Sequence, residues 1–136
     1  MPEFDLKSIM QEAGGFSPNA YGFIRDGLGH TVGMVHGEDA LRTPPSEDDE
    51  SRHVSGRQLC LGLRDYAIHR YGLLAKTVLN RWGVRDTEDF GRIVFALVDA
   101  GLMRKTDDDT LEDFQGVFDF DEEFVASFED SIGTSD

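Results

Sequence analysis

The chain has 136 residues, of which 39% are hydrophobic, and a formal net charge of −14 from 13 basic and 27 acidic side chains. This length and composition are typical of one globular domain with its own core, and no apolar run is long enough to span a membrane. The N-terminus lacks the layout of a signal peptide and the lone Cys60 excludes an internal disulfide, so we expect a cytoplasmic protein with a single domain over residues 1–136.

Two helices are predicted before residue 36. Residues 6–13 carry apolar side chains at helical spacing, which predicts an amphipathic helix that ends at Gly14-Gly15. Ser17 as N-cap and Pro18 at the first helical position predict a second helix that reaches about residue 34. Four glycines fall inside it, each at a cost of about 1 kcal/mol relative to alanine: Gly22, Gly27, Gly29 and Gly33.

Two segments are predicted to lack regular structure. Residues 36–53 contain Pro44-Pro45 and a run of acids, which is typical of a flexible linker with nothing to bury. Residues 133–136 follow the last helical pattern and are predicted to be a disordered tail.

Three consecutive helices are each predicted to end at a glycine followed by an apolar residue. The first begins at Ser55, where Gln58 three residues later completes a capping box, and it ends at Gly72. The second ends at Gly83, and the third, which is the most apolar and therefore expected to be central, ends at Gly101. The second helix is predicted to place Leu74, Val78 and Trp82 on one face, with Ala75 and Leu79 beside them.

Residues 72–106 are predicted to form a helix-turn-helix with a wing. The helix that ends at Gly83 and the helix that ends at Gly101 are joined by a four-residue turn. The second of the two begins at a cap provided by Asp86 or Thr87. Residues 102–106 and 110–114 flank three aspartates, a pattern that predicts two short strands around a turn. The expected fold class is mainly α with a small β-hairpin (α+β), built on a winged-helix-like core of about five to six helices.

Phenylalanines dominate the segment after the predicted hairpin. We expect Phe114, Phe118 and Phe120 to hold this segment on the core. Asp121 is expected to cap a last helix, which would direct apolar side chains inwards at every fourth residue from Phe124.

Charge is unevenly distributed along the chain. The formal charge is −4 over residues 1–71, +2 over residues 72–106 and −12 over residues 107–136. The acidic third repels phosphate backbones and suits basic partners. The candidate basic interaction surface consists of Arg81, Arg85, Arg92, Arg104 and Lys105. The candidate acidic interaction surface consists of Asp107, Asp108, Asp109, Glu122 and Glu123.

The sequence contains no recognisable catalytic or metal-binding constellation. No two of the four histidines have the i, i+4 spacing that places two zinc ligands on one helix face. There is no Gly-x-Ser-x-Gly motif and no Gly-rich phosphate loop, and the alternating acids at 107–109 and 119–123 do not complete an EF-hand loop. We therefore expect no enzyme activity, no catalytic residue, no metal and no cofactor.

Four segments carry a resemblance to a known family. They read HVSGRQLCLGLRDYAIHRYG, AKTVLNRWGV, TEDFGRIVFALVDAGLM and DTLEDFQGVFDFDEEF. In this order they resemble an uncharacterised bacterial protein family that is largely restricted to planctomycetes and verrucomicrobia. The resemblance covers roughly residues 16–128 and implies a bacterial cytosolic setting, without assigning a function or a catalytic residue.

The function predicted from the sequence is that of a non-catalytic, acidic protein-interaction or adaptor module with an unknown protein partner. A homodimer is left open, and neither nucleic acid nor a membrane is expected as a partner. The alternative is a winged-helix nucleic-acid-binding regulator, because arginines surround the predicted helix that ends at Gly101 and the predicted wing after it. Against this alternative, Asp86, Glu88 and Asp89 occupy the start of the helix that would read the bases.

Overall fold

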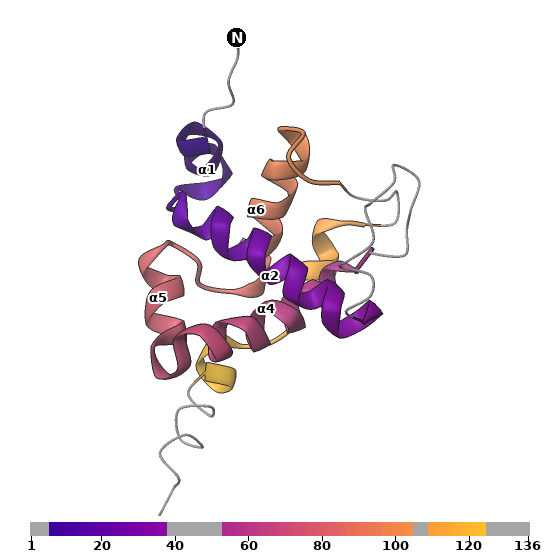
Figure 1. The fold of residues 1–136 in the computed structure, drawn as a ribbon. Coiled ribbons are helices and arrows are strands. Elements are labelled where there is room, and N and C mark those ends of the chain that lie inside the picture. The colour runs from indigo at the N-terminus through magenta and orange to yellow at the C-terminus, as the bar shows by residue number, and fades with distance from the viewer. Residues whose placement is uncertain (1–5, 38–52, 105–108, 125–136) are drawn as a thin grey trace, which may run out of the picture.

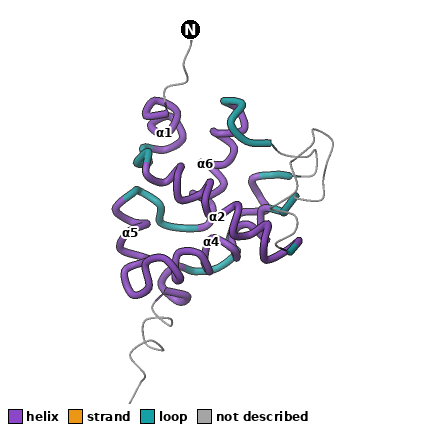
Figure 2. Tube along the Cα trace, viewed as in Figure 1, coloured by secondary structure: helices purple, strands orange, loops and turns teal. Residues whose placement is uncertain are grey.

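The computed structural model describes residues 6–37, 53–104 and 109–124, and all regular secondary structure within these residues is helical (Figures 1 and 2). The α-helices are α1 (Leu6–Gly14), α2 (Asn19–His36), α4 (Gly56–Tyr71), α5 (Ala75–Arg81) and α6 (Thr87–Asp99). Two 3-10 helices, η1 (Gly72–Leu74) and η2 (Leu111–Phe114), follow α4 and α6, and residues 120–124 are again helical. Most of the predicted linker at 36–53 and the whole predicted tail at 133–136 lie outside the described residues.

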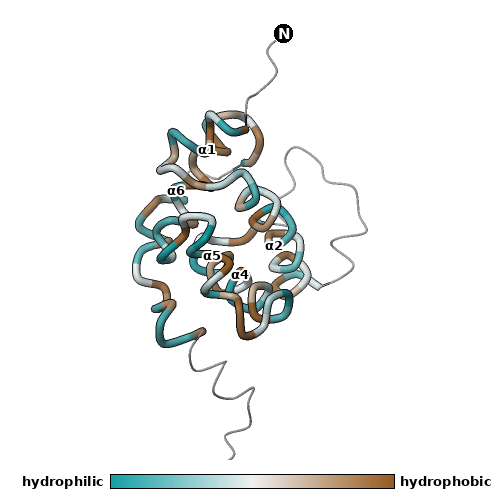
Figure 3. Tube along the Cα trace, turned by 90° about the vertical axis from the view of Figure 1, so that its left-hand side faces the viewer, coloured by the Kyte–Doolittle hydropathy of each residue, from teal (hydrophilic) through white to brown (hydrophobic). Residues whose placement is uncertain are grey.

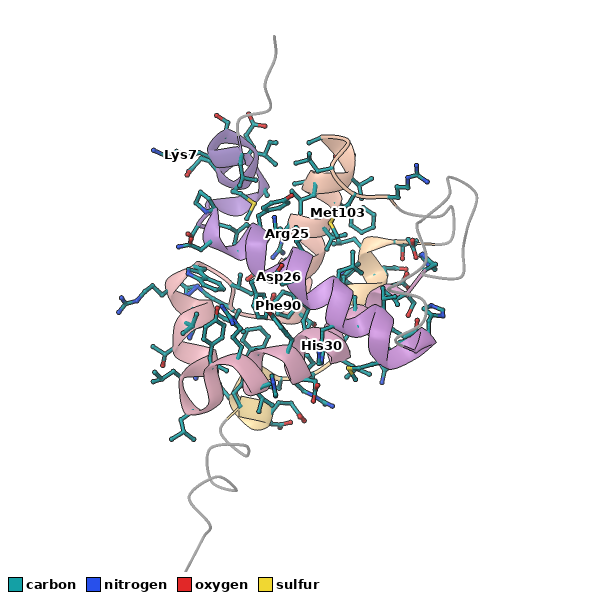
Figure 4. All side chains as sticks on the ribbon, viewed as in Figure 1. Lys7, Arg25, Asp26, His30, Phe90 and Met103 are labelled. Atoms are coloured by element: carbon teal, nitrogen blue, oxygen red, sulfur yellow. The ribbon has the colours of Figure 1, made fainter. Side chains whose placement is uncertain are left out.

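The core lies where α2, α4 and α6 meet. Helix α2 packs along α4, and α1 packs against α6. Phe90 of α6 is completely buried, and Figure 4 labels it in the interior of the molecule, where α2 and α4 approach each other. The ring of Phe23 from α2 stacks on that of Phe90, with 6.3 Å between the ring centroids. The prediction that the most apolar helix is central is confirmed.

Two glycines allow α2 and α4 to approach closely. A Cβ atom added at Gly62 of α4 would lie 2.7 Å from Cβ of Thr31 in α2, and closer still to the Thr31 hydroxyl. A Cβ atom at Gly27 of α2 would overlap with the buried side chain of Leu63. The Thr31 hydroxyl donates to the Gly27 carbonyl at 2.7 Å. Gly27, which lowers helix propensity, is therefore a contact position where no side chain fits.

Side chains cap α4 and α6 at the predicted positions. The Ser55 hydroxyl accepts from the Gln58 N–H at 3.1 Å, and the Ser55 N–H donates to the Gln58 side chain at 2.9 Å. The Asp86 carboxylate accepts from the Asp89 N–H at 2.9 Å, so Asp86 rather than Thr87 is the cap of α6. These bonds satisfy N–H groups that a helix start otherwise leaves unpaired, and both predicted starts are confirmed.

Glycine ends α5 and α6 as predicted. Gly83 has a φ of 93°, and the N–H of Val84 donates back to the Leu79 carbonyl at 2.9 Å. Gly101 has a φ of 81°, and the equivalent hydrogen bond across the end of α6 measures 2.8 Å. Positive φ is readily accessible to glycine, and the bond from the following residue closes the helix end in the way of a Schellman motif.

Helix α4 ends at its predicted glycine, Gly72, but the chain that follows it differs from this pattern. Gly72 has a φ of 53°, but the chain continues directly into η1 and leaves Leu73 and Leu74 47% and 61% exposed. The prediction that Leu74 shares one face of the next helix with Val78 and Trp82 is wrong, because Leu74 lies in η1 before that helix begins. The 3-10 turn sets the rotation of α5 so that Ala75 and Leu79, both fully buried, face the core instead.

The predicted β-hairpin is wrong within the described residues, and with it the winged-helix-like α+β fold class. Residues 102–103 form a bend after α6, and residues 111–114 form η2. Thr110 and Asp113 form a reciprocal capping box, in which the Thr110 N–H donates to the Asp113 carboxylate at 3.1 Å. This local bonding gives the backbone an alternative to a strand ladder. Residues 105–108, which include most of the predicted turn, lie outside the described residues.

Phe114 holds η2 against α4 and α6. Its side chain is 3% exposed, and it fills a notch between two glycines. A Cβ atom at Gly56 would come within 2.7 Å of the Phe114 ring, and one at Gly91 within 2.8 Å of its Cβ. Phe120 is also buried and Phe118 packs partly buried against the core. The prediction that these three phenylalanines attach the segment to the core is confirmed.

The last helical segment begins earlier than predicted. The Asp119 carboxylate accepts from the N–H groups of Asp121 and Glu122, at 2.8 and 3.1 Å. Asp119 is therefore the cap, and the prediction that Asp121 caps this helix is wrong by two positions. The continuation of the helix beyond Phe124 lies outside the described residues.

Candidate interaction surfaces

A shallow acidic hollow lies between the start of α6 and residues 116–123. Its volume is ≈ 620 Å³. Five of its lining residues are acidic and none is basic, and we call this feature the acidic hollow. The residues that line it are Asp86, Thr87, Glu88, Gly116, Val117, Phe118, Asp119, Glu122 and Glu123.

Thr87 joins the two sides of the acidic hollow. The side chain is 1% exposed, and its hydroxyl donates to the Phe114 carbonyl at 2.6 Å. The same oxygen accepts from the Val117 N–H at 3.2 Å. The partners are the backbone carbonyl of the last residue of η2 and a backbone N–H of the turn that follows it. One buried hydroxyl therefore fixes this turn against the first residue of α6.

Several carboxylates of the acidic hollow already have local partners. Glu88 forms an ion pair with Arg92 at 3.2 Å, and Glu123 forms one with Arg64 at 3.2 Å. Asp86 and Asp119 each cap a helix start, where the positive end of the helix dipole favours negative charge. Two of the five acids therefore lie here because the N-terminal ends of two helices meet at the acidic hollow.

The structure separates the residues of the predicted acidic surface. Glu122 and Glu123 line the acidic hollow. Asp109 lies elsewhere, where its carboxylate is 3.3 Å from Nε2 of His53 and its side chain is 13% exposed. Asp107 and Asp108 lie outside the described residues. The hollow also contains three acids that were missing from the predicted surface, namely Asp86, Glu88 and Asp119.

The predicted basic surface is likewise only partly assembled. Arg81 and Arg85 are exposed at the end of α5 and in the turn that follows. Arg92 forms ion pairs with Glu88 and Asp89 of its own helix, one turn away. Arg104 is exposed near the end of the described segment, and Lys105 lies outside it. Between α4 and the end of α6, the exposed basic side chains of the predicted surface therefore lie mainly on α5 and in the turn that follows it.

Apart from Glu88, which lines the acidic hollow, the first turn of α6 is covered rather than exposed. Thr87, Asp89, Phe90 and Gly91 are all buried, and η2 packs directly on this helix. Asp89 is 8% exposed, and its carboxylate accepts from the Arg85 N–H at 2.9 Å. In a helix-turn-helix reader of DNA the corresponding turn reaches base edges, so this surface differs from such a reader at its most important position.

Acidic side chains of the C-terminal segment form ion pairs with two basic residues that are not part of the predicted basic surface. Asp121 forms an ion pair with Lys76 of α5, and Glu123 pairs with Arg64 of α4. The Arg64 guanidinium also lies over the Phe118 ring, 5.8 Å from its centroid. These contacts seat residues 118–123 against α4 and α5.

Three of the four histidines, His30, His36 and His53, each lie next to a single oxygen on a neighbouring segment. His30, labelled on α2 in Figure 4, lies 2.7 Å from the Asp65 carboxylate of α4. His36 contacts the carbonyl of His53 at 2.5 Å. Within the described residues, no group of three or more His, Cys, Asp or Glu side chains is arranged to hold a metal ion.

Cys60 should react with thiol reagents far more slowly in the folded protein than in denaturant. Its side chain is fully buried in α4, and this burial raises the pKa of the thiol from 9.0 to about 12, although Arg57 opposes the shift. A shift of this size lowers the thiolate fraction near neutral pH about a thousandfold. The labelling rate with an aromatic disulfide, compared with and without denaturant at about pH 8, checks this expectation.

The raised pKa of Cys60 also predicts a pH dependence of stability. The unfolded thiol loses its proton above pH 9.0 while the folded thiol keeps it until about pH 12, so the free energy of unfolding should fall across that interval. At pH 10 the loss should be about 1 kcal/mol. Denaturant titrations of the parent and of Cys60→Ala isolate this contribution. An equal decline in both proteins would contradict it.

None of the helices in the described part of the chain is both long enough and apolar enough to cross a membrane. Comparison of the chain with protein-family models, with curated protein sequences and with solved structures found no match. The resemblance to the bacterial family therefore stays a prediction.

Proposed function

We propose that this protein is a non-catalytic cytoplasmic interaction module that binds a basic segment of a partner protein in the acidic hollow. The observation that carries the proposal is the hollow itself, a concave site of ≈ 620 Å³ with five acidic and no basic lining residues. The net charge of −14 extends the same preference to longer range, because it accelerates encounters with positively charged partners.

The apolar lining of the acidic hollow supports lysine and arginine as the recognised side chains. Val117 and Phe118 lie among the carboxylates. Lysine and arginine carry aliphatic stems that pack on such surfaces while their charged ends reach the acids. The Phe118 ring already accepts the guanidinium of Arg64 at 5.8 Å, which is the geometry that an incoming arginine would use on an aromatic face.

Nucleic acid has less support as the partner. The acidic hollow would repel phosphate, and the turn of α6 that would approach base edges is buried beneath η2. The exposed arginines of α5 and its turn remain, but they lie outside the helix that reads bases in this class of protein.

The double variant Asp119→Asn/Glu122→Gln tests the proposal. Asparagine caps a helix as well as aspartate does, so the variant should remove two charges from the hollow without unfolding the last helix. Exposed ion pairs contribute about 0.2–1 kcal/mol each, so affinity for a short peptide of alternating lysine and arginine should fall about fivefold. Isothermal titration at about 50 mM salt measures this change.

The control variant is Glu12→Gln/Asp99→Asn, which changes the net charge equally. Both residues are exposed on α1 and at the end of α6, and neither lines the acidic hollow. Affinity for the basic peptide should be nearly unchanged. Equal weakening in both double variants would mean that only the net charge attracts the peptide, and an absence of binding at low salt would remove the proposed function.

A further inference from the structure

The segment from the end of α4 to the start of α6 is positively charged. Residues 66–85 form the longest stretch of the chain without aspartate or glutamate, and they contain four basic residues. These are Arg70, Lys76, Arg81 and Arg85. Such a segment in a chain of net charge −14 gives the molecule a local area of opposite sign to the acidic hollow.

Two adjacent leucines are exposed within this positive segment. Leu73 and Leu74 occupy η1, at the corner between α4 and α5, and are 47% and 61% exposed. Leu74, Thr77 and Arg81 follow one another at the spacing of one helix face, and all three are exposed. Figure 3 shows the side of the molecule on which α5 lies. We define the corner surface as Arg70, Leu73, Leu74, Thr77 and Arg81.

The exposed leucines are not needed for the core. Ala75 and Leu79 are fully buried and provide the packing of α5, while η1 contributes no buried residue. Most exposed apolar side chains occur singly and need no explanation, but adjacent ones bordered by charge are typical of protein-interaction sites. Arg81 forms no ion pair with any described residue, so its charge is available to a ligand.

We propose that the corner surface binds an acidic amphipathic helix of a partner protein. Leucine-like side chains of that helix would cover Leu73 and Leu74, and its carboxylates would pair with Arg70 and Arg81. A helix bound in this way lays an apolar stripe on exposed apolar side chains with charge beside them, and the corner surface offers the adjacent Leu73 and Leu74 between Arg70 and Arg81. The site lies outside the acidic hollow and takes a ligand of opposite charge, so the protein would hold two unlike partners.

The size of the corner surface favours a single helix over larger anionic partners. Helix α5 has seven residues and is therefore about 10 Å long. A bound peptide helix that covers only the length of α5 would contact mainly residues of the positive segment. A membrane or a nucleic-acid duplex would extend beyond it towards acids such as Asp121, whose side chain is 72% exposed beside Lys76. A symmetric pairing of two corner surfaces would bring like charges together.

Fluorescence anisotropy with a labelled model peptide tests the inference. The probe carries leucines at helical i, i+4 and i+7 spacing with glutamates on the remaining face, and a second peptide has the same composition in scrambled order. The ordered peptide should bind at least about tenfold more tightly than the scrambled one, because only it presents an apolar stripe. Equal affinity for both peptides would overturn the inference.

Two variants of the corner surface locate the site. Leu73→Gln/Leu74→Gln should weaken binding of the ordered peptide about tenfold, and Arg81→Glu should weaken it severalfold with a smaller dependence on salt. Because these side chains are exposed, unfolding temperatures should match that of the parent. Unchanged binding by both variants would overturn the inference.

The controls are Met34→Gln and Lys7→Glu, which change an exposed apolar residue on α2 and an exposed lysine on α1. Figure 4 labels Lys7 on α1, away from α5. Both variants should bind the ordered peptide like the parent. The corner variants should also keep their affinity for the lysine–arginine peptide, so failure here and failure of the proposed function are distinguishable. A different outcome is that the parent protein binds duplex DNA or phosphatidylserine vesicles more tightly than the ordered peptide. If the corner variants lost that binding, the inference would be overturned in favour of DNA or the membrane as the partner.

Discussion

Replacing Phe114 with alanine should destabilise the protein by about 4 kcal/mol. The side chain is 3% exposed and fills the notch formed by Gly56 and Gly91, so truncation loses its buried area and leaves a cavity that two glycines cannot fill. The Phe114 carbonyl also accepts the buried Thr87 hydroxyl, so displacement of η2 would disturb the floor of the acidic hollow. Urea denaturation followed by circular dichroism measures the loss.

Leu111→Ala is the matched control within η2. Leu111 is 37% exposed and packs less completely, so its truncation should cost only about 1 kcal/mol. In a β-hairpin, residues 111 and 114 would lie on opposite faces, and the placement of Phe114 in a glycine notch would not exist. A small effect of Phe114→Ala, comparable with that of Leu111→Ala, would contradict the packing of η2 on α4 and α6.

Replacing Gly62 with alanine should destabilise the protein by about 2 kcal/mol. The added Cβ would lie 2.7 Å from Cβ of Thr31, whose side chain is 1% exposed and cannot turn away without losing its hydrogen bond to the Gly27 carbonyl. Helices α2 and α4 would have to separate. The midpoint of urea denaturation should fall while its slope stays the same.

Gly29→Ala is the corresponding control in α2. A Cβ atom at Gly29 meets no neighbouring atom within 4 Å, and the backbone there has no positive φ. Because alanine has the higher helix propensity, this variant should be stabilised by up to about 1 kcal/mol. A shift of the same sign in both variants would contradict the close contact between α2 and α4.

The parts of the fold that could be predicted from the sequence are those set by local hydrogen bonding. Ser55 and Gln58 lie three residues apart and cap α4 wherever the rest of the chain goes. Gly83 and Gly101 likewise end their helices through their own backbone conformation. Such signals depend on a few neighbouring residues, so they can be recognised in the sequence without any knowledge of tertiary contacts.

The hairpin could not be distinguished from η2 on the same basis. Residues 110–114 fit a short strand by composition, but Thr110 and Asp113 also fit a capping box. The 3-10 helix is favoured over the strand because the Phe114 side chain packs against Gly56 of α4 and Gly91 of α6. A distant contact of this kind leaves no periodic pattern in the sequence. The same holds for Gly27, which reads as a weak helix former until its neighbour Leu63 is known.

The candidate site was only partly predictable for a related reason. Glu122 and Glu123 are consecutive acids and stand out in the sequence, whereas Asp86 is recognisable only as a possible helix cap and Asp119 only as part of an incomplete calcium-loop pattern. The acidic hollow exists because Thr87 joins two segments that are about thirty positions apart in the chain. A threonine directly after a capping aspartate is the one signal that the sequence offers, and capping alone would also explain it.

The measurement that tests the central claim most directly is the mapping of peptide binding on the isotopically labelled protein by NMR. On titration with the lysine–arginine peptide, the proposed function predicts the largest amide shifts at Glu88, Gly116, Val117 and Glu122, which line the acidic hollow. The amides of Leu74 and Thr77, on the corner surface, should hardly move. Shifts spread evenly over all acidic residues, or shifts confined to the corner surface, would contradict it.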